Sequence, residues 1–371
     1  MSILIFLAVL FVLVLVHELG HFVVAKLSKM RVDEFGIGFP PKLFSVKKGE
    51  TTYALNLLPI GGYVKIFGED ETAEGRGRDG GRAPGIVTAN SFTSKSKLAQ
   101  IAVLLAGVTM NVLLAWVLFV VVLTGGVQTA VTEESASSEA VLTVTNVLPE
   151  SPAAQAGISA GAHILALQSG GEALEELTPS AFRTFGANHQ DENLLVTYSV
   201  GNEVATVELI PEEGLVTDMP EQAIIGVGLS LIEVVKTPFL QAVSESTTLT
   251  LATLRDITVG ISKLLFDAVR LKADFSQVAG PVGIVGLVGE ASAFGVSALL
   301  MFTAFISLNL AVINLLPFPA LDGGRLLFVA IEAIKGSPIK SSWVGALNTL
   351  GFGLLILLMI AVTFNDLLRI I

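Results

Sequence analysis

Three residues near the start of the chain have the types and the spacing that metal chemistry needs. His17, Glu18 and His21 follow the pattern His-Glu-x-x-His. On a helix, residues four apart lie on one face, so both imidazoles can reach a single Zn²⁺. Glu18 can lean towards the open coordination position and act as general base for the attacking water. The pattern indicates zinc-assisted hydrolysis, and a chance match in an ordinary helix is the alternative.

The surroundings of this pattern favour function over chance. Hydrophobic residues make up 52% of the 371 residues and charged residues only 15%, whereas soluble proteins carry roughly 25% charged residues. An ionisable side chain in the middle of a membrane helix costs about 2.5–3.5 kcal/mol on insertion scales and is functional by default. A proton relay or an ion pathway would not require this spacing, so we favour a metal site.

Four segments are long and apolar enough to cross a bilayer, since a spanning helix needs about 20 residues. They are residues 3–25, residues 101–123, a stretch within 291–321 and a stretch within 341–364. The first is not a signal peptide, because it has no basic start and no small-residue cleavage site. Residues 237–254 carry Glu245 and one apolar face, so we expect a helix at the membrane surface and not a fifth span.

The distribution of Lys and Arg predicts the orientation in the membrane. Residues 26–97 hold 12 of the 22 basic residues, whereas residues 125–236 hold only Arg183 and Lys236. We therefore expect the first connection in the cytoplasm, and the acidic segment and both termini outside. The net charge of −11 argues against a nucleic-acid partner. Without cysteine, a metal must be held by His, Asp or Glu.

A third ligand is expected after the third apolar run. The sequence there is Asn-Leu-Leu-Pro-Phe-Pro-Ala-Leu-Asp-Gly-Gly, from Asn314 to Gly324, with the aspartate at Asp322. Because the first and third spans both end at the cytoplasmic side, Asp322 can approach the two histidines. A turn carboxylate is the alternative. Asn314 either donates a hydrogen bond to a substrate carbonyl or oxyanion or makes an ordinary contact between helices.

Two other segments predict structure outside the bilayer. Residues 51–67 are rich in strand formers and are broken by Pro59, Gly61 and Gly62. They predict a hairpin with its turn at the centre, which on pattern alone is an ordinary surface ribbon. Residues 69–85 are rich in Gly, Arg and acids, so we expect no fixed structure there.

Residues 127–235 predict an acidic domain that is α+β or mostly β. Strand-like runs alternate with glycine-rich turns in this segment. Residues 151–167 resemble a PDZ domain of the type attached to bacterial proteases, with Ala162 where an acidic residue is usual. His163 and His189 lack metal-ligand spacing and are expected to be ordinary histidines. In the second span, Asn111 is expected to make a contact between helices.

Taken together, these motifs resemble the site-2 protease family of intramembrane zinc metalloproteases, and particularly the bacterial regulator of sigma-E protease type. The resemblance is carried by HELGH at 17–21 and NLLPFPALDGG at 314–324, with support from GFPPKLF at 38–44, GGYVKIFGE at 61–69 and GPVGI at 280–284. It implies Zn²⁺ held by His17, His21 and Asp322, with Glu18 activating water.

The resemblance also implies residues that handle the substrate. Asn314 would do so directly. Gly61, Gly62 and Tyr63 would belong to a re-entrant β-element that pairs with an unwound substrate strand. Two departures are Val108, where the family usually has proline, and a single PDZ-like domain where some members have two.

The expected fold is a polytopic α-helical membrane protein with about four transmembrane helices, an inserted extracytoplasmic PDZ-like domain and a cytoplasmic-side re-entrant β-hairpin. Its parts are residues 1–126, 127–235 and 236–371. The expected function is zinc-dependent cleavage of single-pass membrane proteins, such as anti-sigma factors or remnant signal peptides. The active site would face the cytoplasmic side of the bacterial inner membrane.

The expected PDZ-like domain would filter substrates by size or dock a peptide C-terminus. A non-catalytic membrane receptor or scaffold built around this domain is the alternative function. A transporter with a buried His/Glu relay is a weaker one, because no inverted repeat is evident.

Overall fold

The computed structural model describes residues 1–69, 89–190, 192–201, 203–213, 215, 224–270, 272 and 279–370. They form two compact units. One contains Met1–Val120, Val243–Gly289 and Met301–Ile371, and the other contains Val121–Ala242 and Glu290–Leu300. In the Gly- and Arg-rich stretch at 69–85, only Glu69 belongs to the described residues. The prediction made for the rest of this stretch lies outside them.

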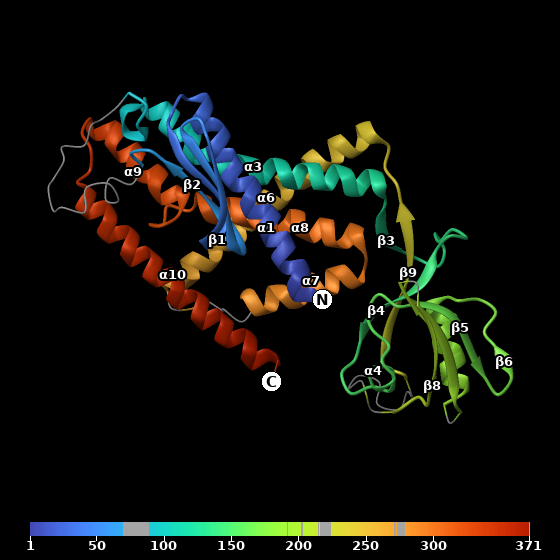
Figure 1. Ribbon diagram of the computed structural model, residues 1–371. Coiled ribbons are helices and arrows are strands. Elements are labelled where there is room, and N and C mark those ends of the chain that lie inside the picture. Colours follow the sequence, from blue (N-terminus) through green and yellow to red (C-terminus); the bar gives the residue numbers. More distant parts are fainter. Residues whose placement is uncertain are drawn as a thin grey trace. The chain divides into compact units, whose positions relative to one another are not determined.

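The first unit is built on long helices. Four helices in the described part of the chain are long and apolar enough to span a membrane: α1 (Ser2–Leu27), α3 (Lys97–Gly125), α8 (Val296–Leu315) and α10 (Ser341–Ile370) (Figure 1). Each coincides with one of the four predicted spans, which are confirmed as helices. Long apolar runs without internal proline satisfy all backbone hydrogen bonds within the helix, as a bilayer requires.

Three further helices complete this set: α6 (Phe239–Val269), α7 (Pro281–Ala293) and α9 (Asp322–Lys335). The prediction of a surface helix ending near residue 254 was wrong in its length, since α6 has 31 residues. One face of α6 packs on α3 and α8, where Ile257 joins a buried cluster with Phe119 and Leu308. The missed part, beyond residue 254, carries Arg255, Asp256, Lys263 and Asp267, which interrupt the apolar pattern.

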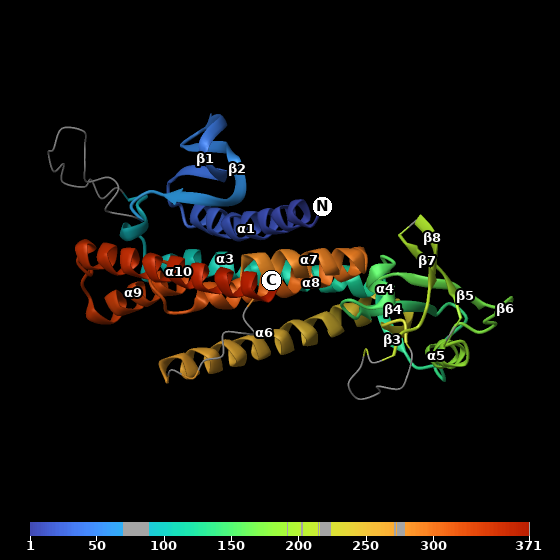
Figure 2. The same cartoon turned by 90° about the horizontal axis from the view of Figure 1, so that it is seen from below.

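A two-stranded sheet flanks α1 (Figure 2). Its strands are β1 (Val32–Lys48) and β2 (Thr51–Ile66). Residues 42–48 pair with 51–56 across a turn at Gly49, whose φ is +64°. Residues 32–37 pair with 62–66 on one side and with residues of 52–55 on the other.

The predicted hairpin within residues 51–67 was therefore wrong in its pairing. Its two halves lie on either side of residues 32–37 and are not paired with each other. The reason is that the preceding segment also forms a strand. Its start is fixed by burial, since Val32 and Ile66 pack with Ala25 of α1 and Val103 of α3.

The second unit is a strand-rich domain. Its sheet has the order β3 (Val127–Val131), β9 (Val227–Val235), β4 (Val141–Val147), β5 (His163–Ser169), β7 (Leu194–Val200) and β8 (Glu203–Leu209), with β6 (Glu172–Ala173) paired to β5. Helices α4 (Pro152–Gln155) and α5 (Pro179–Asn188) accompany the strands. Leu142, Leu167, Phe182 and Val196 belong to its core.

Candidate metal centre

Helix α1 presents His17 and His21 on one face, as their spacing predicts. Both are buried, with 8% of each residue exposed. The two Nε2 atoms point to the same place and lie 3.1 Å apart. The imidazole rings are nearly perpendicular, which directs both nitrogens to one point without stacking the rings.

Helix α9 delivers Asp322 to the same point. Its Oδ2 atom lies 3.0 Å from His17 Nε2 and 3.3 Å from His21 Nε2. Asp322 is the first residue of α9, after the proline-containing break that ends α8. A side chain at Gly323 or Gly324 would clash with backbone carbonyls of that break, so the two glycines allow α9 to begin against the end of α8.

Helix α3 supports the two histidines from behind, through three residues spaced four apart. The carbonyl oxygen of Val103 accepts a hydrogen bond from His21 Nδ1 at 2.8 Å. The amide of Asn111 lies 3.3 Å from His17 Nδ1. Between them, a Cβ on Gly107 would lie 2.6 Å from His17 Cε1 and closer still to His21 Nε2. The stripe 103–107–111 therefore fits around both rings. The expected contact of Asn111 with another helix is confirmed. Val103 and Gly107 were not predicted, and the four-residue repeat with glycine at its centre is the signal that could have identified them.

The three candidate ligands fit Zn²⁺. Tetrahedral zinc with bonds of about 2.0–2.1 Å separates its ligand atoms by about 3.3 Å, close to the distances of 3.0–3.3 Å found here. Zinc-bound histidines donate their second N–H to a partner that fixes the ring. His21 already does so. For His17, the Oδ1 atom of Asn111 is buried without a partner in the described residues, and turning the amide over would make it the acceptor.

The two imidazoles favour the ionised form of Asp322. Burial opposes ionisation of its carboxyl, but hydrogen bonds and charge interactions with His17 and His21 outweigh it and hold the pKa of Asp322 well below its usual value. The carboxylate is thus present in the ionised form that binds a cation.

Glu18 lies beside the sheet. A Cβ on Gly62 would come within 3.5 Å of Glu18 Cγ, so β2 passes directly over the proposed base. Gly62 is buried, and the same Cβ would lie 3.0 Å from the carbonyl oxygen of Gly36. In the described part of the chain, no side-chain hydrogen bond engages Glu18.

The other predicted substrate residues have different surroundings. Gly61 has a φ of +91° and lies against the ring of Phe39. The hydroxyl of Tyr63 donates a hydrogen bond to Glu34 Oε1 at 2.8 Å, so the hydroxyl proton already has an acceptor within the sheet. Asn314, one residue before the end of α8, is partly buried and forms no hydrogen bond through its amide with the residues described. No interaction joins it to the three candidate ligands.

The remaining histidines have local partners in the second unit. His163 Nδ1 lies 2.9 Å from the hydroxyl of Thr143. His189 Nδ1 donates to the carbonyl oxygen of Phe185 at 2.9 Å, and its ring stacks on the Phe185 ring. Among the described residues, His17, His21 and Asp322 form the one group with metal-binding geometry.

Four helices long enough to span a membrane and a His-His-Asp group with metal-binding geometry indicate the class of a membrane metallohydrolase, and comparison with known proteins gives the family. The sequence model of the family described as Peptidase family M50 matches residues 5–358. CPE1693 of Clostridium perfringens, whose name describes a zinc metalloprotease, is 35% identical over 96% of this chain and 95% of its own.

Two further relatives are called RasP. The zinc metalloprotease RasP of Geobacillus kaustophilus is 30% identical over 98% of this chain and 97% of its own. The regulator of sigma-W protease RasP of Bacillus subtilis is 30% identical over 96% of each chain. This chain belongs to peptidase family M50, the site-2 protease family. It is a zinc metalloprotease whose cofactor is Zn²⁺.

Proposed function

We propose that this protein cleaves single-pass membrane proteins within or next to their transmembrane segments, with His17, His21 and Asp322 holding Zn²⁺. The observation that carries the proposal is the convergence of these three side chains from α1 and α9, with ligand atoms within 4.8 Å of one another. Spanning helices and bacterial relatives support a location in the bacterial cytoplasmic membrane. The basic residues at 26–97 support an active site near the cytoplasmic face.

The chain's own residues divide the chemistry between them. When bound, Zn²⁺ lowers the pKa of water towards about 7 and polarises the scissile carbonyl. Glu18 accepts the proton of the attacking water and returns it to the leaving amine. The amide of Asn314 donates a hydrogen bond to the oxygen that gains negative charge. Val103 and Asn111 keep the histidine rings in the tautomer and orientation that ligation needs.

The substrate binds as an extended strand along residues 62–66 of β2. A transmembrane helix hides its carbonyls in hydrogen bonds, so it must unwind before hydrolysis. Residues 62–66 pair with 32–37 on one side. No described strand pairs with the other edge, which leaves backbone groups for an added strand. Gly62 brings this edge next to Glu18, while Gly61 allows the turn into it. Tyr63 stabilises this edge through the hydrogen bond of its hydroxyl to Glu34 and contacts the substrate with its ring.

The second unit selects substrates. We assign it as a PDZ-like domain outside the cytoplasm, where it docks a peptide C-terminus or excludes substrates with large outer domains. Anti-sigma factors and remnant signal peptides are the substrate classes we favour. The name of the Bacillus subtilis relative, regulator of sigma-W protease, supports the first class.

The test uses the purified full chain in lipid nanodiscs, with a model single-span substrate. We expect about one zinc per chain in the parent and in Glu18→Gln, and cleavage by the parent alone. Equal cleavage by both proteins would remove Glu18 as the base. A purified parent with full activity and no zinc would overturn the metal site. A non-catalytic receptor would bind the substrate without cleaving it.

A further inference from the structure

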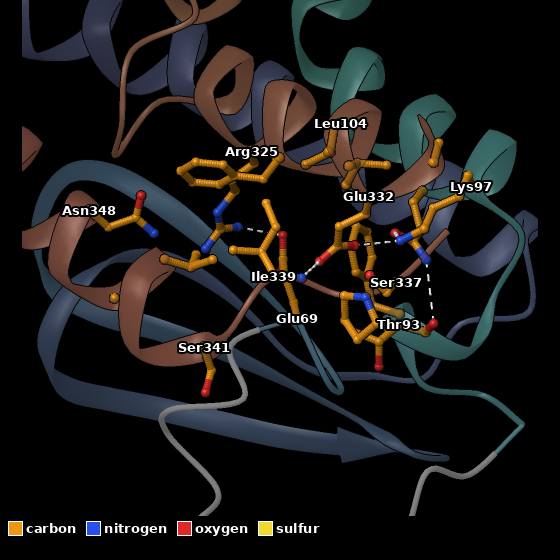
Figure 3. A pocket seen from close by; sticks show the side chains of 18 of the residues that line it. Glu69, Thr93, Lys97, Leu104, Arg325, Glu332, Ser337, Ile339, Ser341 and Asn348 are labelled. Carbon is orange, nitrogen blue, oxygen red and sulfur yellow. Dashed lines mark hydrogen bonds and ion pairs between the residues drawn. The ribbon is translucent and has the colours of Figure 1, made fainter. Parts of the chain in front are cut away.

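A cavity of about 560 Å³ lies in the first unit. Its walls come from the start of α3, the length of α9 and the start of α10, together with Glu69 beyond the end of β2 (Figure 3). Apolar side chains, among them Leu104, Phe328 and Val344, line part of it, and polar side chains such as Gln100 and Asn348 line the rest. Neither the sequence motifs nor the catalytic roles above account for this cavity.

Two helices, α3 and α9, run from the metal centre to the cavity. On α3, Gly107 touches the histidines, and Leu104 lines the cavity one turn earlier. On α9, Asp322 is the candidate ligand, and Arg325 lines the cavity one turn later. One helical turn advances about 5 Å, and extended peptide advances about 3.3 Å per residue. The cavity therefore starts about two residues of extended substrate away from the scissile bond.

Strand β2 also leads from the metal centre to the cavity. Residues 62–66 begin beside Glu18, and the chain continues to Glu69 in the cavity wall. A substrate strand that follows this edge away from the metal centre therefore arrives at the cavity. Because α3 and α10 are both spanning helices that begin at this wall, the arriving peptide is leaving the bilayer.

The charges around the cavity are arranged in two acid–base pairs. Arg325 is paired with Glu69, and Lys97 Nζ lies 2.6 Å from Glu332 Oε2. The acids are the less exposed partners, with side-chain exposures of 13% for Glu69 and 19% for Glu332, against 32% for Arg325 and 36% for Lys97. A phosphate group would have to break one of these pairs and leave a sheltered carboxylate without its cation. An apolar side chain of a peptide meets no such cost.

We propose that this cavity is a specificity subsite that takes one bulky apolar side chain of the substrate, two to four residues from the scissile bond on its cytoplasmic side. The inference rests on the proposed function, since it requires a peptide substrate at the metal centre. The apolar wall takes the side chain, and the paired charges at the wall remain as they are. Peptides with glycine at this position lose that burial.

Photocrosslinking tests the location in a chain that does not cleave, with the scissile bond mapped beforehand on the parent. A photoreactive phenylalanine is placed at Ala333, which lines the cavity, in the Glu18→Gln chain in nanodiscs of phosphatidylethanolamine and phosphatidylglycerol. Ile331, exposed on the same helix and outside the cavity lining, provides the matched control position. We expect position 333 to crosslink to the model substrate two to four residues from the scissile bond, and position 331 not to. Crosslinks from 333 to lipid alone, or equal substrate crosslinks from both positions, would overturn the proposal.

Specificity gives the second test. Ala333→Trp, which narrows the cavity, should lower kcat/KM on the order of tenfold for a substrate with leucine at the crosslinked position. It should leave the glycine-containing substrate and the zinc content unchanged. Equal losses for both substrates would overturn the subsite. If the parent cleaves neither substrate, the proposed function fails, and the crosslinking result still decides whether a peptide occupies the cavity.

Discussion

Adding one methyl group at Gly107 should weaken zinc binding and leave the fold in place. A Cβ there would lie 2.6 Å from His17 Cε1 and 2.8 Å from His17 Nε2, and closer still to His21 Nε2. Carbon atoms in contact prefer about 3.5–4.0 Å, so the rings have to move by about 1 Å. Metal-ligand distances tolerate only about 0.2 Å. We expect Gly107→Ala to weaken zinc binding at least about 100-fold, or about 2.8 kcal/mol.

The helix that carries Gly107 should survive the change. Alanine is more favourable than glycine in a helix interior by about 1 kcal/mol, so the variant should keep its helix content even without zinc. Gly125→Ala is the matched control, because it lies in the same helix and its Cβ would have no neighbour within 4 Å. Zinc affinity is measured by competition with a chelator, and helix content by circular dichroism. If Gly107→Ala binds zinc as tightly as Gly125→Ala, the rings do not face Gly107, and the arrangement of α1 on α3 is wrong.

Three other changes test the remaining parts of the centre. Asp322→Ala should lower zinc occupancy, measured by elemental analysis at limiting zinc, and unchanged occupancy would mean that the third ligand is elsewhere. Asn111→Leu should weaken zinc binding by about 10–100-fold. Asn111→Asp, which keeps an oxygen acceptor, should restore most of the affinity. Tight zinc binding by the leucine variant would mean that Asn111 does not orient the His17 ring. Partial burial of Glu34 opposes ionisation of its carboxyl, but hydrogen bonds from Lys42 and Tyr63 outweigh this effect and lower the pKa of Glu34. These hydrogen bonds to Glu34 therefore stabilise the sheet fully above the pKa that the carboxyl has in the unfolded chain. Their stabilisation is lost as the pH falls through the lowered pKa of the folded protein. Hydrogen exchange at residues 62–66 should show this acid-dependent step in the parent and not in Glu34→Gln.

Local sequence was sufficient for the four spanning helices and the histidine pair. Long apolar runs predict spanning helices because a bilayer leaves the backbone no other partner. The spacing of His17 and His21 places both rings on one face, whatever α1 contacts. Asp322 was within reach of the same reasoning, because the direction of the spans limits which carboxylates can meet the histidines.

Tertiary structure decided what surrounds these residues. The pairing of β2 depended on β1, because residues 32–37 separate two segments that local pattern alone joins as a hairpin. The role of Gly107 and Asn111 depended on the packing of α3 against α1, which brings a glycine and an amide to the histidine rings. The cavity formed only where α3, α9 and α10 meet. Periodicity along one chain reports which face of an element is apolar, but a contact between distant segments depends on the three-dimensional arrangement of both partners.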